Sequence, residues 1–166
     1  MDLLTADLRV LAAATLDVLK RRGWRVTTPE SCTGGLIAGA LTEIAGSSDA
    51  VGRGFVTYSN LAKHEMLGVP QATLEAHGAV SPETVRAMAE GALRAAGRDA
   101  DVAVAVSGVA GPGGGSAEKP VGTVHFGVAA RGAPTETHHR VFAGDRTAIR
   151  LQTVQLALEL VRAKAG

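Results

Sequence analysis

Serine, cysteine and threonine stand side by side in residues 30–35, which read ESCTGG, and two glycines follow them at once. These residues are unfavourable in the interior of a helix or a strand, because hydroxyl side chains compete with the backbone for hydrogen bonds and glycine loses the most entropy on folding. A turn rich in glycine lets the backbone approach a ligand, and it would leave the N–H groups of Thr33, Gly34 and Gly35 free to bind an anion or a developing oxyanion. Ser31 is therefore a candidate nucleophile. The plainer interpretation is that Ser31 or Thr33 only caps the next helix.

A serine nucleophile needs a base, and the segment YSNLAKHEMLGV, residues 58–69, offers Lys63 together with Tyr58. Lysine accepts a proton near neutral pH only if burial lowers its pKa from about 10.4 toward 7 or 8. The Tyr58 hydroxyl would then hydrogen-bond to Ser31 or Lys63 and pass the proton. The alternative is that Lys63 is a solvated cation on a helix surface and that Tyr58 is a core residue with a satisfied hydroxyl.

No histidine is well placed by sequence to be that base. His64 neighbours a helical surface and His77 precedes a turn, while His138 and His139 point to opposite faces of one expected strand. That strand geometry argues against a metal shared by the last two. The single cysteine, Cys32, excludes an intrachain disulfide framework and the four-ligand zinc patterns. We therefore expect no metal site.

A third candidate group is the glycine-rich segment SGVAGPGGGSAEKPVGTV, residues 107–124. It lacks the residue order of a phosphate loop and of a dinucleotide-binding turn, because a strand is expected to follow it. Its amides would nevertheless suit a phosphate or a planar ring, and a mobile connection is the equal alternative. Arg146, with Arg150 one turn later, offers a planar fork to a phosphate, although arginines on helix surfaces usually bind nothing. The candidate binding residues of this loop are Ser107, Gly111, Gly113 and Gly114.

The composition is that of one globular domain over residues 1–166, with 46% apolar and 20% charged residues. Seventeen Lys and Arg stand against sixteen Asp and Glu without a run of like charges, so we expect no nucleic-acid partner. The acidic amphipathic start, MDLLTADLRV, is unlike a secretory signal, and no apolar run approaches the roughly 20 residues of a membrane span. We expect a soluble, cytoplasmic protein.

The elements that would position these groups alternate between helix and strand. Apolar spacing, caps and glycine stops predict helices over residues 4–22, 34–46, 60–67, 69–78, 82–96 and 144–161. Apolar and β-branched runs predict strands over residues 24–30, 51–59, 101–108, 121–130 and 135–143. The strand at 101–108 reads as a central parallel strand, and the last two as a hairpin with a polar edge. On the last helix, one buried face is expected to carry Thr147, Leu151, Val154, Leu158 and Val161. The sequence thus predicts an α/β fold, a mixed sheet sandwiched by helices.

Taken together, and in this order, ESCTGG, YSNLAKHEMLGV, GAVS, the glycine-rich segment and GDR resemble the family of the C-terminal domain of the competence/damage-inducible protein CinA. The likeness runs from about residue 8 to residue 160. The stand-alone members of that family are nicotinamide-nucleotide amidohydrolases. Many relatives carry this domain behind a molybdopterin-binding-like domain, and the activity of such a partner is not expected here.

The resemblance implies hydrolysis of the carboxamide of nicotinamide mononucleotide to nicotinic acid mononucleotide and ammonia, without a metal or an organic cofactor. By motif it assigns a serine/lysine amidase role to Ser31 and Lys63, with Tyr58 assisting. It also implies that the glycine loop, Ser107, Asn60 and Arg146 hold the ribose and phosphate of the substrate, and that the chain forms a homo-oligomer.

Two other interpretations stay open from the sequence. Cys32 is a rival nucleophile, because a helix N-terminus would favour its thiolate. The second is a nucleotide-binding module without catalysis, in which Lys63 stays charged and the glycine loop holds a phosphate. Release of ammonia from nicotinamide mononucleotide separates this module from an enzyme.

Overall fold

The computed structural model describes residues 2–166 and is built on a five-stranded sheet in the order β2-β1-β3-β4-β5. The strands are β1 (Val26–Glu30), β2 (Val51–Val56), β3 (Val102–Gly108), β4 (Thr123–Ala130) and β5 (Glu136–Val141). The helices are α1 (Ala6–Arg22), α2 (Leu36–Thr42), α3 (Asn60–Leu67), α4 (Gln71–His77), α5 (Pro82–Ala96) and α6 (Arg146–Ala165). β1 pairs in parallel with β2 and β3, and β3, β4 and β5 are antiparallel neighbours. The predicted mixed sheet, with its terminal hairpin and polar edge strand β5, is confirmed.

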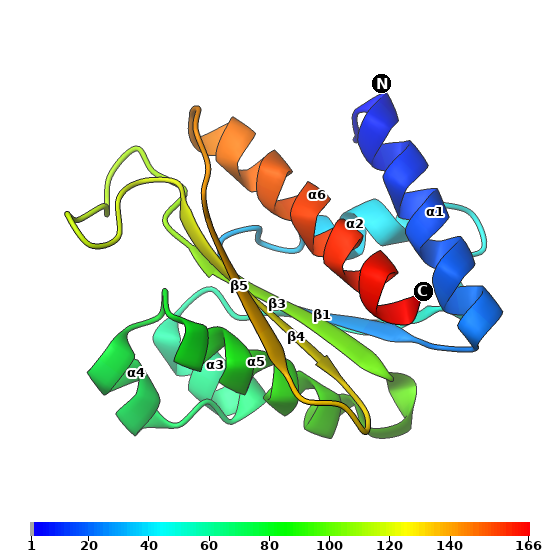
Figure 1. Ribbon diagram of the computed structural model, residues 1–166, viewed down its shortest axis with the longest axis horizontal. Coiled ribbons are helices and arrows are strands. Elements are labelled where there is room, and N and C mark those ends of the chain that lie inside the picture. The colour runs from blue at the N-terminus through cyan, green and yellow to red at the C-terminus, as the bar shows by residue number, and fades with distance from the viewer. Residues whose placement is uncertain (1) are drawn as a thin grey trace.

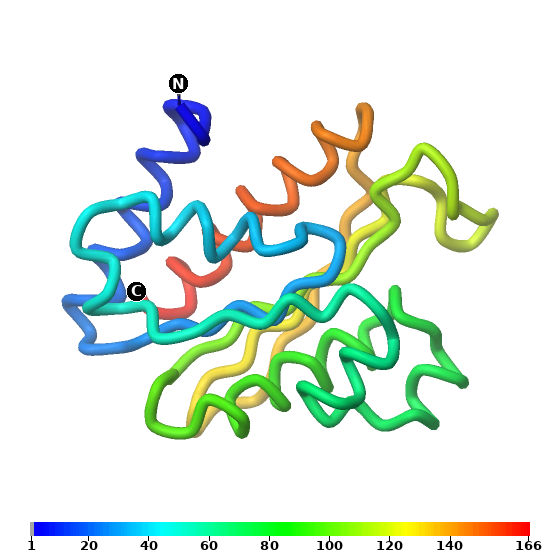
Figure 2. Tube along the Cα trace, turned by 180° about the vertical axis from the view of Figure 1, so that it is seen from behind, coloured from blue at the N-terminus to red at the C-terminus, as the bar shows by residue number. Residues whose placement is uncertain are grey.

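Helices cover both faces of the sheet, with α1, α2 and α6 on one face and α3, α4 and α5 on the other (Figure 1). The view from behind shows the same two layers (Figure 2). β3 supplies both cores because its side chains alternate between the faces. Val102, Val104 and Val106 belong to the core under α1, α2 and α6, whereas Ala103 and Ala105 belong to the core under α5. The small residues on the second face let α5 lie close to the sheet.

Local capping signals explain where most helices begin and end. Ser59 caps α3 by accepting the N–H of Ala62, and Ser81 caps α5 by accepting the N–H of Thr84, with Pro82 in the first turn as expected. Gly23 ends α1 in the left-handed region, with φ of 71°. These predictions are confirmed to within a few residues.

Two expectations about helices are wrong in detail. The helix expected over residues 34–46 is only α2, Leu36–Thr42, because Gly34 and Gly35 have positive φ and form the preceding turn. α6 begins at Arg146. Val154, Leu158 and Val161 of its expected buried face are buried as predicted, whereas Thr147 is exposed and Leu151 half-buried, and Ile149 and Thr153 are buried in their place. Several spacings of apolar residues fit one helix, and contact with α1 and the sheet selects among them.

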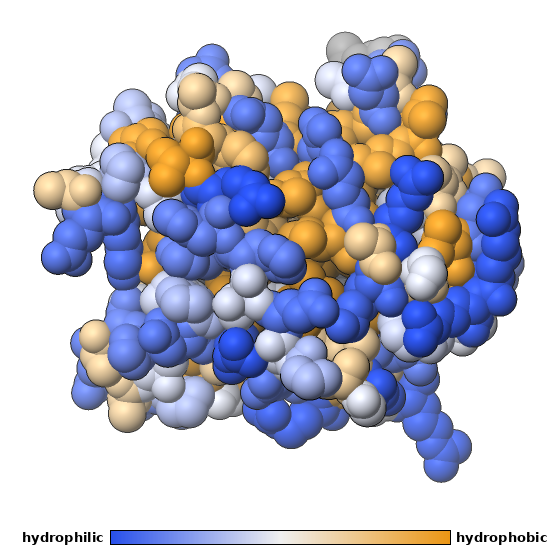
Figure 3. Space-filling model, in the orientation of Figure 1, coloured by the Kyte–Doolittle hydropathy of each residue, from blue (hydrophilic) through white to orange (hydrophobic). Residues whose placement is uncertain are grey.

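Hydrophilic side chains dominate the surface, and apolar side chains are visible over α1 and α6 (Figure 3). A shallow groove there is lined by residues of both helices, including Leu8, Leu11 and Leu151. Within residues 2–166, no helix combines the length and the apolar character needed to span a bilayer.

Candidate active site

The candidate residues meet at the carboxyl ends of β1, β2 and β3, the edge of an α/β sheet where ligands usually bind. A pocket of about 280 Å³ opens there. Its lining comes from the turn after β1, the start of α3, the segment before α5, the end of β3, the glycine loop and the first turn of α6. It includes the predicted residues Ser31, Tyr58, Lys63, Ser107, Gly111, Gly113, Gly114 and Arg146.

Lys63 and Ser31 are in direct contact in this pocket. Lys63 Nζ lies 2.9 Å from Ser31 Oγ, and it also donates to the carbonyl oxygens of Thr57 at 2.9 Å and Tyr58 at 3.3 Å. Only 1% of Lys63 and 7% of Ser31 is exposed. Ser59 starts α3 four residues before Lys63, so the lysine points back over the end of β2 toward β1. The contact expected between these two side chains is present.

The environment of Lys63 favours its neutral form. Burial lowers its pKa from 10.5 to about 8, and the charge of the nearby Cys32 thiolate would oppose that shift. Within residues 2–166 no carboxylate forms a salt bridge with Lys63. A buried cation without a carboxylate is unfavourable, so a sizeable fraction of Lys63 is an uncharged amine near pH 8.

Tyr58 lines the pocket but differs from the expectation in its contacts. Its side chain is 63% exposed, and its hydroxyl accepts a hydrogen bond from Arg146 Nη2 at 3.2 Å. Within residues 2–166, its hydroxyl has no hydrogen bond to Ser31 or Lys63; the contact with Lys63 is made by the Tyr58 carbonyl. The tyrosine projects from the end of an edge strand into solvent, where the basic group that it meets is an arginine of α6.

Turn 31–35, which joins β1 to α2, is held by a buried carboxylate that sequence reasoning did not single out. Glu30 Oε1 accepts the Thr33 hydroxyl at 2.6 Å and the N–H of Ile37 at 2.9 Å, and its Oε2 accepts the N–H of Ala38 at 3.0 Å. Burial raises the pKa of Glu30, and these hydrogen bonds oppose the rise. Glu30 therefore does the capping that was considered for Ser31 and Thr33.

This arrangement narrows the set of amides that are free to bind an oxyanion. The Gly34 N–H donates to the Ser31 carbonyl at 3.0 Å, and the Gly35 N–H faces the Glu30 carboxylate. Among the described residues, the N–H groups of Cys32 and Thr33 have no main-chain acceptor or acceptor on another side chain. The unpaired donors are thus one residue earlier than expected, beside Ser31.

Cys32 is less suited to be the nucleophile than its neighbour. It is 5% exposed, and burial together with the Glu30 carboxylate raises the pKa of its thiol to about 11. The helix that was expected to favour its thiolate begins only at Leu36, and the N–H groups of Ile37 and Ala38 in its first turn are taken by Glu30. Cys32 is therefore a protonated thiol at neutral pH.

The remaining predicted binding residues lie in three places. Arg146 donates to the Gly111 carbonyl at 2.7 Å, so it ties the start of α6 to the glycine loop. Asn60 is exposed and lines a separate hollow between α3 and α4, together with Leu61 and His64. Thr33, Gly34 and Gly35 belong to turn 31–35 but are not among the residues that line the 280 Å³ pocket.

Sequence reasoning missed the roles of several residues of this site. Ala79 and Val80, which belong to the GAVS motif but were given no role, complete the pocket wall. Arg150, considered for a phosphate beside Arg146, donates instead to the carbonyls of Cys32 and Thr33. Glu30 carried a usable signal, because an acidic residue that ends a buried strand needs hydrogen-bond donors nearby. The contact of Arg150 with the turn carried no such signal, since it depends on packing between distant segments.

The histidines lie away from this centre. His125 and His139, on β4 and β5, stack with ring centroids 4.6 Å apart. Burial, with the charges of His139 and Lys119, lowers the pKa of His125 to about 4. In the described part of the chain, no group of three or more His, Cys, Asp or Glu side chains is arranged to hold a metal ion.

Comparison with known proteins identifies relatives along almost the whole chain. The CinA C-terminal domain family matches residues 8–165. "Nicotinamide-nucleotide amidohydrolase PncC" of Enterobacter agglomerans is 62% identical over 141 residues, 85% of each chain. The Escherichia coli (strain K12) protein with the same name is 53% identical over 154 residues, 93% of this chain and 92% of the relative. The crystal structure of competence/damage inducible protein CihA from Agrobacterium tumefaciens, 55% identical, superposes with a TM-score of 0.92 over 98% of both chains. The chain belongs to the CinA C-terminal domain family.

Proposed function

We propose that this protein is a nicotinamide-nucleotide amidohydrolase that converts nicotinamide mononucleotide and water to nicotinic acid mononucleotide and ammonia, as part of pyridine-nucleotide recycling. The contact between Lys63 Nζ and Ser31 Oγ carries the proposal. It agrees with the name of the Enterobacter agglomerans and Escherichia coli relatives.

The hydrogen bonds of Lys63 suit a neutral amine that acts as the base. An uncharged amine has two N–H bonds and one lone pair. The carbonyls of Thr57 and Tyr58 accept the two N–H bonds, which leaves the lone pair for the Ser31 hydroxyl. Lys63 takes the Ser31 proton while Ser31 Oγ attacks the carboxamide carbon.

The reaction is then completed in two stages. The C–N bond of the first tetrahedral intermediate breaks as the Lys63 ammonium returns the proton to the leaving nitrogen, so that ammonia departs and an ester joins the substrate to Ser31. Lys63, neutral again, takes a proton from water as that water attacks the ester carbon and forms a second tetrahedral intermediate. The ester C–O bond then breaks, Lys63 returns the proton to Ser31 Oγ, and the carboxylic acid departs. The N–H groups of Cys32 and Thr33 are the donors for the oxyanion of both intermediates.

The other pocket residues bind the rest of the nucleotide. Arg146, at the first turn of α6, offers a planar pair of donors to the phosphate, and it would exchange its contacts with Gly111 and Tyr58 for the anion. Tyr58 assists by placing its carbonyl against Lys63 and its hydroxyl against Arg146. Ser107 and the glycine loop line the same pocket. Asn60 would join them only for a substrate that extends toward α3 and α4.

Ammonia release tests the proposal directly. The purified chain is incubated with nicotinamide mononucleotide, with other pyridine nucleotides and with simple amides, and ammonia and the acid product are both measured. Turnover of nicotinamide mononucleotide is expected. If that nucleotide binds without releasing ammonia, the chain is the non-catalytic module that was considered from sequence.

The pH dependence tests the base. Because the free enzyme needs neutral Lys63, kcat/KM should rise with pH and level off above about 8, the pKa to which burial lowers this lysine. A profile that stays flat between about pH 6 and 9 would remove Lys63 from the role of base.

The proposal also includes the domain organisation, the oligomeric state and the compartment of the protein. We treat residues 1–166 as one amidohydrolase domain that forms a homo-oligomer in the cytoplasm. Analytical ultracentrifugation of the active enzyme checks the oligomer, and fractionation of cells checks the compartment.

A further inference from the structure

Arg150 reaches turn 31–35 from α6, and the mechanism above does not use it. Its Nε donates to the Cys32 carbonyl and its Nη2 to the Thr33 carbonyl, both at 3.1 Å. The guanidinium is a rigid planar fork, so two such bonds fix the turn against α6 in both distance and orientation. Within residues 2–166 Arg150 forms no ion pair, and its hydrogen bonds go only to this turn.

The bond to Cys32 orients the peptide unit that carries the Thr33 N–H, because Arg150 is the only donor to that carbonyl among the described residues. The Thr33 carbonyl, in contrast, also accepts the Leu36 N–H at 3.1 Å. The C=O and N–H of one trans peptide unit point in opposite directions. Because the Cys32 carbonyl faces Arg150, the N–H of Thr33 faces away from it, and it has no acceptor among the described residues. The next unit behaves in the same way: the Thr33 carbonyl faces Arg150, and the Gly34 N–H turns away to the Ser31 carbonyl.

The turn is therefore held from two sides. Glu30 accepts the donors at its α2 end, and Arg150 donates to its central carbonyls. Every carbonyl of residues 31–33 then has a donor, whereas among the described residues the N–H groups of Cys32 and Thr33 have no acceptor on another residue. Without Arg150, the Cys32 carbonyl would have no partner, and the peptide units could rotate and carry these amides and Ser31 with them.

We infer that Arg150 is a positioning residue of the amidase, which holds turn 31–35 so that Ser31 and the unpaired amides keep the geometry needed for attack. This inference rests on the proposed function. It assigns Arg150 no contact with the substrate, and its effect passes through the backbone of the turn.

Replacement of the guanidinium tests the inference. Arg150→Ala should lower kcat for nicotinamide mononucleotide by about 10- to 100-fold, because small displacements at a reacting centre have effects of that size. KM should change less than threefold, since Arg150 is not among the residues that line the pocket. The midpoint of the kcat/KM pH profile should stay where it is in the wild type, because Lys63 keeps its surroundings.

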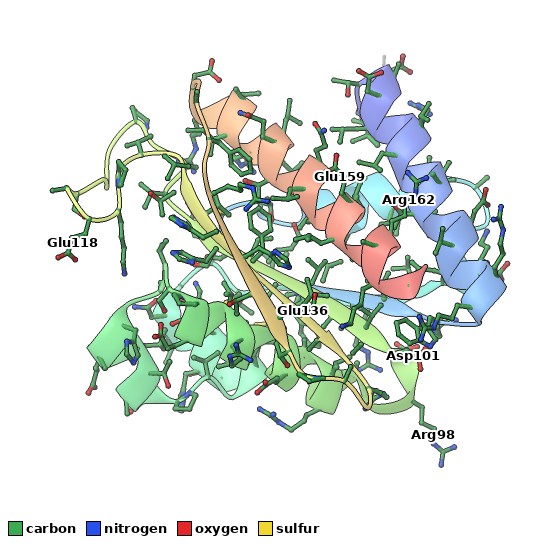
Figure 4. All side chains as sticks on the ribbon, in the orientation of Figure 1. Arg98, Asp101, Glu118, Glu136, Glu159 and Arg162 are labelled. Atoms are coloured by element: carbon green, nitrogen blue, oxygen red, sulfur yellow. The ribbon has the colours of Figure 1, made fainter. Side chains whose placement is uncertain are left out.

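Chemical rescue distinguishes positioning from a general loss of stability. Millimolar guanidinium chloride should restore part of the kcat of Arg150→Ala, and sodium chloride at the same ionic strength should not. Arg150→Gln keeps one planar amide donor. The kcat values of Arg150→Gln and Arg150→Lys should both fall between those of the wild type and Arg150→Ala, and these two variants replace Arg150→Ala in the test if it does not fold. Arg162→Ala is the matched control, since Arg162 lies on the same helix near its other end and is exposed (Figure 4).

These measurements separate a failure of the inference from a failure of the proposed function. If the wild type releases no ammonia, the proposed function fails and Arg150 has no role to test. If the wild type is active and a folded Arg150→Ala keeps kcat within twofold of it, or sodium chloride rescues as well as guanidinium, the inference fails while the proposed function stands.

Discussion

Basic side chains at the two ends of the parallel strands have opposite environments. At the amino ends, Arg25 and Arg53 lie 3.4 and 3.0 Å from the carboxylate of Asp99, and Asp101 accepts the Arg25 N–H at 2.8 Å. At the carboxyl ends, Lys63 is buried with carbonyl and hydroxyl oxygens as its partners. Figure 4 shows the separation: Asp101 and Arg98 lie at one end of the molecule, and Glu118 lies on the glycine loop at the other.

This difference shows which environment allows a lysine to act as a base. Arg25, Arg53 and Asp99 keep about a third or more of their side chains exposed, so water and opposite charge stabilise their ionised forms. Lys63 has neither, and its pKa falls toward 8. The same sheet thus provides a charged end that adds modest stability and a desolvated end that provides chemistry.

The largest effect is expected from the nucleophile itself. Ser31→Ala should lower kcat by about 10⁴- to 10⁶-fold, because Lys63 then has no hydroxyl to deprotonate. Cys32→Ala should stay within a few-fold of the wild type, since the buried thiol is protonated. Ammonia release by both variants decides between the two residues, and activity that survives the first change but is lost with the second would make Cys32 the nucleophile.

Removal of the buried lysine should have the next largest effect. Lys63→Met should lower kcat/KM by about 10²- to 10⁴-fold, the usual contribution of a general base, and it should abolish the rise of the profile near pH 8. Arg53→Met, which removes a paired cation at the opposite end, should leave kcat/KM unchanged. A Lys63→Met enzyme with more than a tenth of the wild-type activity would contradict the comparison.

The buried lysine should also make stability depend on pH. Between pH 8 and 10.5 the unfolded chain keeps the proton that folded Lys63 releases, so the free energy of unfolding rises with pH in this window. The wild type should therefore gain on the order of 3 kcal/mol relative to Lys63→Met from pH 8 to 10.5. Denaturant unfolding of both proteins across the window measures the difference, and parallel curves would mean that Lys63 is charged when folded.

Tyr58 tests whether a hydroxyl at the rim of the pocket takes part in proton transfer. Tyr58→Phe should change kcat/KM by only about 2- to 10-fold, the value of one hydrogen bond, because the substitution removes only the hydrogen bond with Arg146. The carbonyl that holds Lys63 belongs to the backbone and remains. A loss of 100-fold or more would mean that the hydroxyl passes the proton, as the sequence first suggested.

Most of the fold could be predicted because its signals are local. Ser59, Ser81, Pro82 and Gly23 mark helix ends, and the Val/Ala run of β3 identifies a strand covered on both faces. The order of the strands could not be read, since pairing between distant segments leaves no local pattern. The first turns of α6, at Thr147 and Leu151, were misjudged for the same reason, whereas Val154, Leu158 and Val161 are buried as predicted.

The site was predictable to the extent that its chemistry required unusual residues. A serine before two glycines and a lysine after a strand end are chemically informative, and they lie 2.9 Å apart. Glu30, an acidic residue that ends a buried strand, carried a signal of its own. The contacts of Arg150 and Tyr58 were not predictable. They depend on how α2 and α6 pack around turn 31–35, and sequence spacing does not encode those distances.

The smallest effect is expected at the amino ends of the strands. Asp99→Asn should lower the free energy of unfolding by only about 0.2 to 1 kcal/mol, because its ion pairs with Arg25 and Arg53 are partly exposed. This difference should shrink in 1 M salt, which screens exposed charges beyond about 3 Å, and kcat should not change. The pH-dependent difference between the wild type and Lys63→Met should persist in the same salt, because it arises from desolvation of a buried group. Unfolding of the three proteins at low and high salt therefore separates the two ends of the sheet, and equal screening of both differences would mean that Lys63 is as open to solvent as Asp99.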